Sequence, residues 1–359
     1  MLSINHNNLR AVCRAISSGG GSSPEEAEQV ANNLVDANLS GHDSHGIGML
    51  PRYIACIPTG ELQPNAEIEI ISDEGTTLVI DGKQGYGQVI GKKAMELGIE
   101  RARQHGVCVV AVRNSFHLCR IGAWGEQCAA AGMVSMHHVN VHGHDGMVAP
   151  FRGTDSRFTT NPYCAVMPGT DNNPPTVLDF ATSIVAGGKV RVAKNKGEQM
   201  PEGYLLDNQG KPTTDPNALY TSPKGAIRAM GDHKGYGLSV INELFGGVLS
   251  GGGTCLPENK HESDTILNGM LSVIIDPMRL VTQAFFNSET DATIAHVKAS
   301  PPANPAEPVL VPGDPERMTK AERGAEGVPV DEETWAEMIG AAESVGISRT
   351  EIEAIAFKN

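Results

Sequence analysis

The feature that most constrains the fold is an alternation of strand-like and helix-like segments that begins near Gly75. Short aliphatic runs predict strands at residues 76–80, 107–112, 133–141, 163–167, 176–179 and 270–275. Longer segments predict helices at residues 89–104, 122–131 and 234–249. Alternation of this kind is typical of an α/β protein, in which helices cover a sheet.

The segment before this region reads mainly helical. Ser23, Pro24 and Glu26 form a strong helix start, because serine can cap, proline suits the first turn and glutamate can complete a capping box. Apolar residues then recur at helical spacing, which predicts a helix over residues 24–39. An earlier helix is expected over residues 7–16.

The C-terminal part changes texture again. From Ser300 the chain is rich in proline, with the run "SPPANPAEPVLVPGDPE", which predicts a long surface connection. The tail over residues 331–357 carries two helical patterns split by Gly346.

Composition excludes several classes of protein. The 359 residues carry a net charge of -14, which argues against a nucleic-acid surface because phosphate binding needs clustered Lys and Arg. No apolar run approaches the roughly 20 residues that span a bilayer, and the N-terminus lacks a signal-peptide pattern. The seven cysteines are scattered without a CxxC pair. We therefore expect a cytoplasmic protein with reduced thiols and no membrane partner.

A glycine-rich run follows the first predicted strand. The run "GYGQVIG", from Gly85 to Gly91, lies between a strand and a helix, as a dinucleotide-binding fingerprint would. Its third glycine is one residue late, so the spacing favours a glycine-rich turn. A dinucleotide that binds this chain is not expected to bind in the Rossmann manner.

The run "HHVNVHGHD", from His137 to Asp145, resembles a metal site. On a strand, however, His137 and His138 point to opposite faces, and a zinc site needs three or four converging ligands. We therefore expect no metal. A metal-dependent lyase or hydrolase that uses His137, His142, His144 and Asp145 stays open as the alternative function.

Two further segments suit anions. Four basic residues gather between Gly187 and Gly197, where a solvated face and an anion site are both open. His233 and Lys234 begin a predicted helix, whose N-terminal N–H groups and dipole favour negative charge.

The stretch "GHDSHGIG", from Gly41 to Gly48, holds two histidines, an acid and a hydroxyl between glycines. Histidine suits proton transfer because its ordinary pKa lies near neutrality, and a serine beside it can relay a proton or orient the ring. A polar turn is the other interpretation.

Several blocks occur together in a known order. They are "DSHGIGMLPRY", "NSFHLCRIGAWGEQCAAAG", "VAPFRG", "TNPYCAVMPG", "LDFATSIVAGGKVRVA", "PEGYLLDNQGKPTTDP" and "HKGYGLSVINELFGGVLSGG". Nearly the whole chain resembles the type 2 malate/L-lactate dehydrogenase family of NAD(P)-dependent oxidoreductases. "GHDSHGIGM" and "PGDPERMTKAERGAEGVPVD" are most similar to its hydroxycarboxylate dehydrogenase B branch.

This resemblance implies a family-specific, non-Rossmann α/β fold of the L-sulfolactate dehydrogenase type. Residues 1–74 and about 305–359 would form a smaller, discontinuous helical domain. Residues 75–304 would form a mixed-sheet domain that binds nucleotide and substrate. The resemblance also implies a homodimer with the active site near the subunit contact, a small 2-oxo or 2-hydroxy acid as substrate, and NAD or NADP as cofactor.

The resemblance assigns roles residue by residue. It makes His45 the proton donor, Ser44 a relay, and His117 a histidine that some relatives use as proton acceptor. The expected cofactor contacts are His45, Cys119, Arg120, Ile121, Val177, Leu178, Asp179, Phe180, Ala181, His233, Lys234, Asn268, Gly313, Asp314, Pro315 and Glu316. The expected substrate contacts are Arg52, Arg120, Thr160 and Asn161.

Two positions depart from the family pattern. Cys119 stands where the family's cofactor loop usually begins with glycine, and it leaves less room for close backbone approach. Met49 stands where many relatives carry an arginine that clamps the substrate carboxylate. Arg52 or Arg120 would then supply the charge. Met49 would favour a bulkier, apolar acid of the phenylpyruvate type, beside malate-like and lactate-like acids.

Overall fold

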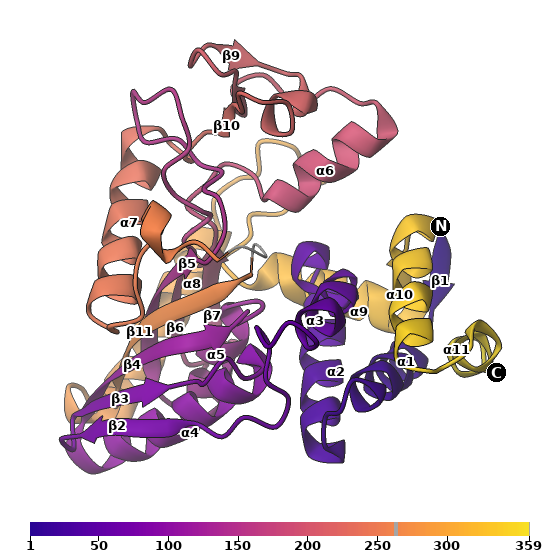
Figure 1. Ribbon diagram of the computed structural model, residues 1–359. Helices are drawn as coiled ribbons and strands as arrows, with labels where there is room; N and C mark the ends of the chain where they lie inside the picture. The colour runs from indigo at the N-terminus through magenta and orange to yellow at the C-terminus, as the bar shows by residue number, and fades with distance from the viewer. Residues whose placement is uncertain (262–264, 359) are drawn as a thin grey trace.

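A mixed seven-stranded sheet forms the centre of the protein, in a computed structural model that describes residues 1–261 and 265–358, without the side chains of residues 195 and 196 (Figure 1). The strand order is β2-β3-β4-β11-β5-β6-β7. Only β3 and β4 run parallel among these pairs, and the other neighbours are antiparallel. The bounds are β2 Glu69–Asp73, β3 Thr77–Asp81, β4 Val107–Phe116, β5 Val134–His142, β6 Tyr163–Met167, β7 Thr176–Phe180 and β11 Leu267–Ile275.

Helices pack against the sheet through aliphatic side chains. Helix α4 (Gly87–His105) joins the parallel strands β3 and β4, and α5 (Gly122–Ala130) packs beside it. Their buried residues form one apolar cluster with the strands, in which Trp124 is the largest side chain. Helix α7 (His233–Glu243) continues as a π-helical turn, Leu244–Val248, which contacts β5 and β11.

A separate helical unit is built from both ends of the chain (Figure 1). Strand β1 (Leu2–Ile4) pairs antiparallel with β12 (Val328–Val330), which fixes the N-terminal segment against the C-terminal one. The helices of the unit are α1 His6–Gly19, α2 Pro24–Leu39, α3 Leu50–Cys56, α9 Asp314–Glu326, α10 Glu332–Ser344 and α11 Arg349–Ala356.

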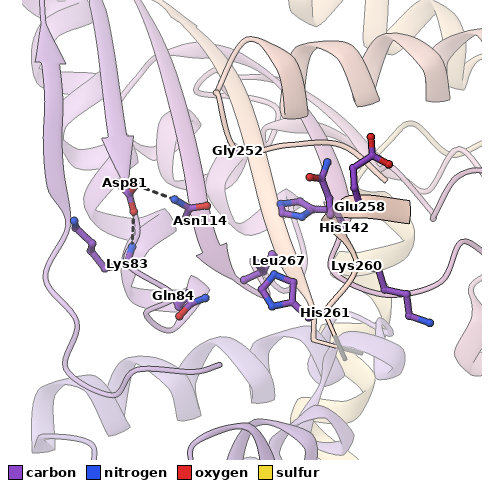
Figure 2. Close-up of a pocket in the computed structure, with 11 residues that line it drawn as sticks. Asp81, Lys83, Gln84, Asn114, His142, Gly252, Glu258, Lys260, His261 and Leu267 are labelled. Carbon is purple, nitrogen blue, oxygen red and sulfur yellow. Dashed lines mark hydrogen bonds between the residues drawn. The ribbon is translucent and has the colours of Figure 1, made fainter. Parts of the chain in front are cut away.

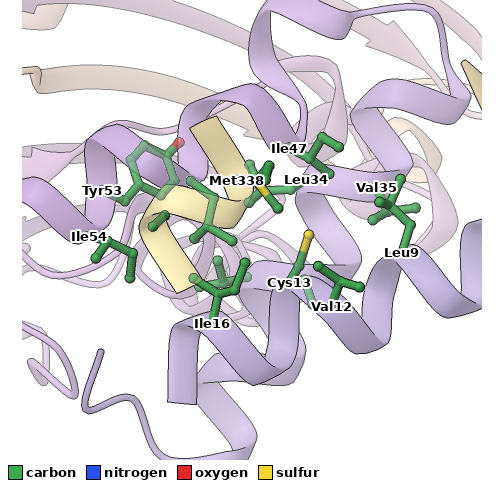
Figure 3. Close-up of a cluster of buried hydrophobic side chains, with 14 of the residues drawn as sticks. Leu9, Val12, Cys13, Ile16, Leu34, Val35, Ile47, Tyr53, Ile54 and Met338 are labelled. Atoms are coloured by element: carbon green, nitrogen blue, oxygen red, sulfur yellow. The ribbon is translucent and has the colours of Figure 1, made fainter. Parts of the chain in front are cut away.

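The core of this helical unit joins residues far apart in sequence. Figure 3 shows Leu9 of α1 beside Val35 of α2, and Leu34 of α2 beside Met338 of α10. All four side chains are fully buried. Burial of a large aliphatic side chain stabilises the folded state by about 1.5–3 kcal/mol, so the terminal segments hold each other in place.

A third, smaller layer covers one end of the sheet. Helix α6 (Gly187–Lys196) lies beside a short sheet of β8 (Leu205–Leu206), β9 (Pro212–Thr213) and β10 (Ala226–Ile227). Val148, Val190 and Ile227 belong to its small apolar core. Helix α8 (Gln283–Lys298) follows β11 and carries the chain toward the proline-rich segment.

The sequence-based expectations for most elements are confirmed. All six predicted strands are present, and α2 has the predicted bounds because Ser23 accepts a hydrogen bond from the Glu26 N–H at its start. The proline-rich connection is shorter than predicted, because it already ends at Gly313, where α9 begins. Gly313 has φ +94°, a left-handed conformation that suits glycine, and Pro315 occupies the first turn. Within the described ranges, no helix is long and apolar enough to cross a membrane.

Candidate active site

The structure brings together His45 and His117, which lie at the ends of two different elements. His45 ends a short 3-10 turn, Asp43–His45, after α2, and His117 directly follows β4. Their rings stack with centroids 5.4 Å apart and planes inclined by 26°. The two residues that the sequence assigns to acid–base chemistry therefore face each other where the helical unit meets the sheet.

The turn that carries His45 is fixed by Asn38 of α2. The Asn38 Oδ1 atom accepts from the Ile47 N–H at 2.8 Å, and its Nδ2 donates to Asp43 Oδ1 at 2.7 Å. Arg323 of α9 also donates to Asp43, at 2.7 Å. A side chain at Gly46 would overlap the Asn38 amide, so this glycine is required for close approach.

His45 has polar groups on several sides. Ser44 Oγ lies 3.0 Å from His45 Nδ1, and the Cys119 thiol donates to the His45 carbonyl at 2.9 Å. Burial, together with the smaller electrostatic effects of His42 and Arg120, lowers the pKa of His45 to about 4. A neutral imidazole at position 45 can accept a proton.

His117 is buried and held by a hydrogen-bond chain. Its Nδ1 lies 2.6 Å from the Tyr53 hydroxyl, which accepts from Gln88 Nε2 at 3.2 Å. Burial, the neighbouring His45 and Arg52 hold the pKa of His117 well below its ordinary value. The sequence did not point to Tyr53 or Gln88, because their partners lie 35 and 64 residues away along the chain.

Helix α4 approaches His117 closely. A side chain at Gly87 would overlap the His117 carbonyl, and its Cβ would lie 2.6 Å from the Phe116 carbonyl oxygen. The run "GYGQVIG" thus supplies a glycine for contact between a helix start and a strand end. This geometry agrees with the turn interpretation of that run.

A buried charged cluster adjoins His45. Arg120 is 5% exposed, and its Nη2 donates to Glu126 at 2.5 Å, while its Nε and Nη1 meet no hydrogen-bond partner within the described part of the chain. Asp179 accepts from the Gly122 N–H at 2.7 Å, and burial raises the pKa of its carboxyl. A guanidinium with unpartnered N–H groups can bind a carboxylate or a phosphate.

The predicted cofactor segments 177–181 and 313–316 lie side by side. The Val177 N–H donates to the Pro312 carbonyl at 3.1 Å, and Glu316 reaches His42 at 3.4 Å. Electrostatic interactions link Arg120 to both Asp179 and Glu316. Three predicted segments therefore meet at one place, beside His45. Asp314 itself pairs with Lys298 and Arg317.

Other predicted ligand contacts have their side chains engaged inside the protein. Asn268 is buried; it accepts from the Leu118 N–H at 2.8 Å and donates to the Asn140 carbonyl at 3.0 Å. Asn161 is fully buried and donates to Glu243 at 2.6 Å. Thr160 is tied to the same region by its backbone, because its carbonyl accepts from the Thr182 N–H. Asn268 thus supports the loop that carries Cys119, Arg120 and Ile121.

The predicted pair His233 and Lys234 begins α7, as expected from the sequence. The ring of His233 lies 5.9 Å from that of Phe151. The preceding segment is tied to the end of β7, because the Met230 N–H donates to the Thr182 carbonyl. This pair is therefore joined to the 177–181 segment through the backbone.

The histidine-rich run from His137 is engaged in the sheet. His137 lies 2.8 Å from Ser272 Oγ and 2.9 Å from Ser135 Oγ, whereas His138 lies 2.8 Å from Asn242 Oδ1. Asp145 pairs with Lys224 and Lys260. Across residues 1–261 and 265–358, no group of three or more His, Cys, Asp or Glu is placed to hold a metal ion.

A cavity of about 630 Å³ opens at the ends of β3, β4 and β5 (Figure 2). His142 lies at its wall, 3% exposed, with neither ring nitrogen hydrogen-bonded to the described residues. Burial lowers the pKa of His142 to about 4. The lining residues are Asp81, Lys83, Gln84, Asn114, His142, Gly252, Glu258, Asn259, Lys260, His261 and Leu267, so this cavity does not include the His45–His117 pair.

Comparison with known proteins gives consistent matches. A family model described as malate/L-lactate dehydrogenase matches residues 4–339. The chain is 45% identical over 350 residues to hydroxycarboxylate dehydrogenase B of Escherichia coli K12, covering 97% of this chain and 95% of that protein. It is 37% identical over 322 residues to L-lactate dehydrogenase of Cupriavidus necator, covering 90% and 92%.

A solved structure agrees with the expected fold class. Sulfolactate dehydrogenase from Methanocaldococcus jannaschii superposes with a TM-score of 0.84 at 33% identity, covering 98% of this chain and 99% of that one. The α/β fold of the L-sulfolactate dehydrogenase type is thus confirmed, as is the resemblance to the hydroxycarboxylate dehydrogenase B branch. The chain belongs to the malate/L-lactate dehydrogenase family.

Proposed function

We propose that this protein is an NAD(P)-dependent oxidoreductase that interconverts a 2-oxo acid and the corresponding 2-hydroxy acid. The observation that carries the proposal is the stacking of His45 on His117 beside the buried Arg120. Two uncharged imidazoles and a cation suit proton exchange with a hydroxyl group next to a carboxylate. Relatives named as hydroxycarboxylate, lactate and sulfolactate dehydrogenases support the same reaction class.

The cofactor would be NAD or NADP, held outside any Rossmann crevice. The proposed contacts include the loop 119–121 and the segments 177–181 and 313–316, which adjoin that loop. Further proposed contacts are His45, Asn268, and the pair His233 and Lys234 at the start of α7. When bound, a nicotinamide coenzyme would supply or take the hydride.

His45 would move the proton. In oxidation, its neutral ring takes the hydroxyl proton of the 2-hydroxy acid, with Ser44 orienting Nδ1. In reduction, the protonated ring returns that proton to the alkoxide oxygen. Negative charge on the bound acid and coenzyme would raise the low pKa of His45 and so favour this protonated form.

Arg120 is the proposed anchor for the substrate carboxylate. It is buried, carries unpartnered N–H groups and acts electrostatically on His45. Met49 packs partly buried against the helical core and brings no charge to the site. This combination favours an acid with an apolar tail, such as one of the phenylpyruvate type, with malate-like and lactate-like acids as the smaller candidates.

The domains and the assembly follow from the same proposal. The helical domain, 1–74 with about 305–359, supplies His45, and the α/β domain, 75–304, supplies His117 and Arg120.

A homodimer is supported by an outward stripe of Ile241, Leu244, Val248 and Leu249, 39–58% exposed at helical spacing. A cytoplasmic location is supported by seven free cysteines, six of them buried.

A panel of 2-oxo acids, each tested with NADH and with NADPH, tests the proposal. The expected result is acid-dependent loss of absorbance at the nicotinamide band with at least one pair. The panel should include phenylpyruvate, oxaloacetate, pyruvate and 2-oxoglutarate, with a metal chelator added in parallel. The proposal would be contradicted if no pair of acid and coenzyme reacts, or if the chelator abolishes the reaction. Either result would favour the metal-dependent alternative.

A further inference from the structure

Gln88, Tyr53 and His117 form a single chain of buried hydrogen bonds. Gln88 and Tyr53 are both fully buried, and His117 is 8% exposed. Gln88 Nε2 donates to the Tyr53 oxygen at 3.2 Å, and that oxygen lies 2.6 Å from His117 Nδ1. The three groups come from α4, α3 and the end of β4, so three separate elements hold the chain in place.

Counting protons along the chain gives the state of the imidazole. An amide N–H can only donate, so the Tyr53 oxygen accepts from Gln88. The phenol hydrogen then points to the other neighbour in the chain, which is His117 Nδ1. A nitrogen that accepts a hydrogen bond carries no proton, so the proton of the neutral ring lies on Nε2.

The surroundings oppose a charged state of either Tyr53 or His117. Burial raises the pKa of Tyr53 well above its ordinary value, so the phenol keeps its hydrogen. A second proton on His117 would place an Nδ1 hydrogen against the phenol hydrogen of Tyr53. The phenol hydrogen has no acceptor on its other side, because Gln88 presents an N–H donor there. The titratable groups that face His117 are His45 on the 3-10 turn, Arg52 and Tyr53 on α3, and His144 after β5. Positive charge on His45, Arg52 or His144 would also disfavour a positively charged His117.

We propose that Gln88 and Tyr53 are positioning residues that hold His117 as the neutral tautomer protonated on Nε2. His117 then offers a fixed N–H donor to the substrate oxygen, and His45 alone exchanges the proton. This division of labour rests on the proposed function, whereas the tautomer of His117 does not. It differs from the expectation, drawn from the family resemblance, that the histidine at position 117 accepts the proton.

Nitrogen-15 NMR of histidine-labelled protein tests the tautomer directly. The chain has 12 histidines, so the His117 signals are identified by their loss in His117→Gln. We expect Nδ1 to resonate as an unprotonated nitrogen and Nε2 as a protonated one, with neither moving between about pH 5 and about pH 8, where ordinary histidines titrate. A proton on Nδ1, which a reversed Gln88 amide would produce, or titration of the ring in this range, overturns the proposal.

Variants test whether the chain sets that state. Tyr53→Phe and Gln88→Met should let the two His117 nitrogen signals converge, because the ring then exchanges between tautomers. Tyr86→Phe is the matched control: Tyr86 is equally buried and packs edge-on against Tyr53 at 6.0 Å, but lies outside the chain of hydrogen bonds. It should leave both signals in place. Unchanged signals in Tyr53→Phe would overturn the positioning role.

Kinetics give a second, separable readout. Tyr53→Phe should lower kcat by about 10- to 100-fold, the range found for groups that orient metal-bound histidines, with little change in KM for the coenzyme. If no 2-oxo acid is reduced by the wild type while the NMR result is as expected, the proposed function fails and the tautomer assignment stands. If activity is present and the proton lies on Nδ1, the inference fails and the function stands.

Discussion

The imidazole rings of His45 and His117 lie 5.4 Å apart in a stacked arrangement, although 72 residues separate them in sequence. Two positive charges at this distance would repel each other strongly in a partly buried site. The electrostatic effect of His45 indeed lowers the pKa of His117. The pair therefore holds one mobile proton at most.

Removal of the His45 ring should abolish most of the catalysis. His45→Ala deletes the group that exchanges the proton, so we expect kcat to fall by about two to four powers of ten, as is typical of general acid–base loss. Steady-state rates with the best acid and coenzyme measure the effect. His296→Ala, which removes an exposed histidine on α8, should change kcat by less than twofold. Near-normal turnover in His45→Ala would move the acid–base role to His117.

The pH dependence should differ between the two directions. With His45 at a pKa of about 4, the protonated fraction falls tenfold per pH unit above that value. Reduction needs the protonated ring, so its rate should fall tenfold per unit from about pH 5 to about pH 8. Oxidation needs the neutral ring and should be level over the same range. Both rates are taken with acid and coenzyme far below saturation, so that they report the unliganded enzyme; a break near the ordinary histidine pKa in either profile contradicts this assignment.

Local signals explain why much of the fold could be predicted. The bounds of α2 match the prediction because Ser23, Pro24 and Glu26 act within one turn of chain. Strand β2 gave no such signal: Ile70 and Ile71 are 46% and 42% exposed at the edge of the sheet, so its apolar residues do not alternate. The sequence did not predict helix α6, because it begins at two glycines and its basic residues dominate the pattern. The apolar layer that this helix covers comes from distant residues.

Replacement of Arg120 should weaken binding of the acid more than binding of the coenzyme. Arg120→Met removes up to two charge-assisted hydrogen bonds, each worth about 1.5 kcal/mol, so KM for the 2-oxo acid should rise by about 100-fold. Coenzyme affinity, measured by calorimetry without acid, should change by less than about tenfold. Arg113→Met, which removes a half-buried arginine paired with Asp81, is the control and should leave both constants unchanged. A larger loss of coenzyme affinity would reassign Arg120 to the cofactor.

The site was less predictable from sequence than the fold. His45 and His117 could be named from the family resemblance, but the partners that set their protonation could not. Tyr53 reads as an ordinary apolar position of α3, and Gln88 as a polar residue in the first turn of α4. Only the packing of α3, α4 and the end of β4 joins them, and such packing leaves no periodic signal in the chain.

The outward apolar stripe on α7 and the π-helical turn should mediate self-association. Val248→Glu places a charge in the middle of the stripe, where Val248 is 56% exposed. A buried, unpaired charge opposes association, so the variant should sediment as a 37.9 kDa monomer while the wild type sediments as a dimer. Ile70→Glu, at the far edge of the sheet, should leave the dimer intact. A monomeric wild type, or a dimeric Val248→Glu protein, would refute the assignment of this face.

Substitution of two glycines tests close packing and helix propensity separately as contributions to stability. In Gly87→Ala the new Cβ would overlap the His117 carbonyl, so α4 must shift away from the end of β4. Overpacking of this kind typically costs about 1–3 kcal/mol, and here it would also displace the His117 ring. In Gly340→Ala the new Cβ meets open space on α10, and the gain in helix propensity should raise the free energy of unfolding by about 1 kcal/mol. Urea denaturation at a common slope measures both effects. A stable, fully active Gly87→Ala protein would mean that the glycine-rich turn tolerates a side chain, and that its glycine is not there for contact with the strand end.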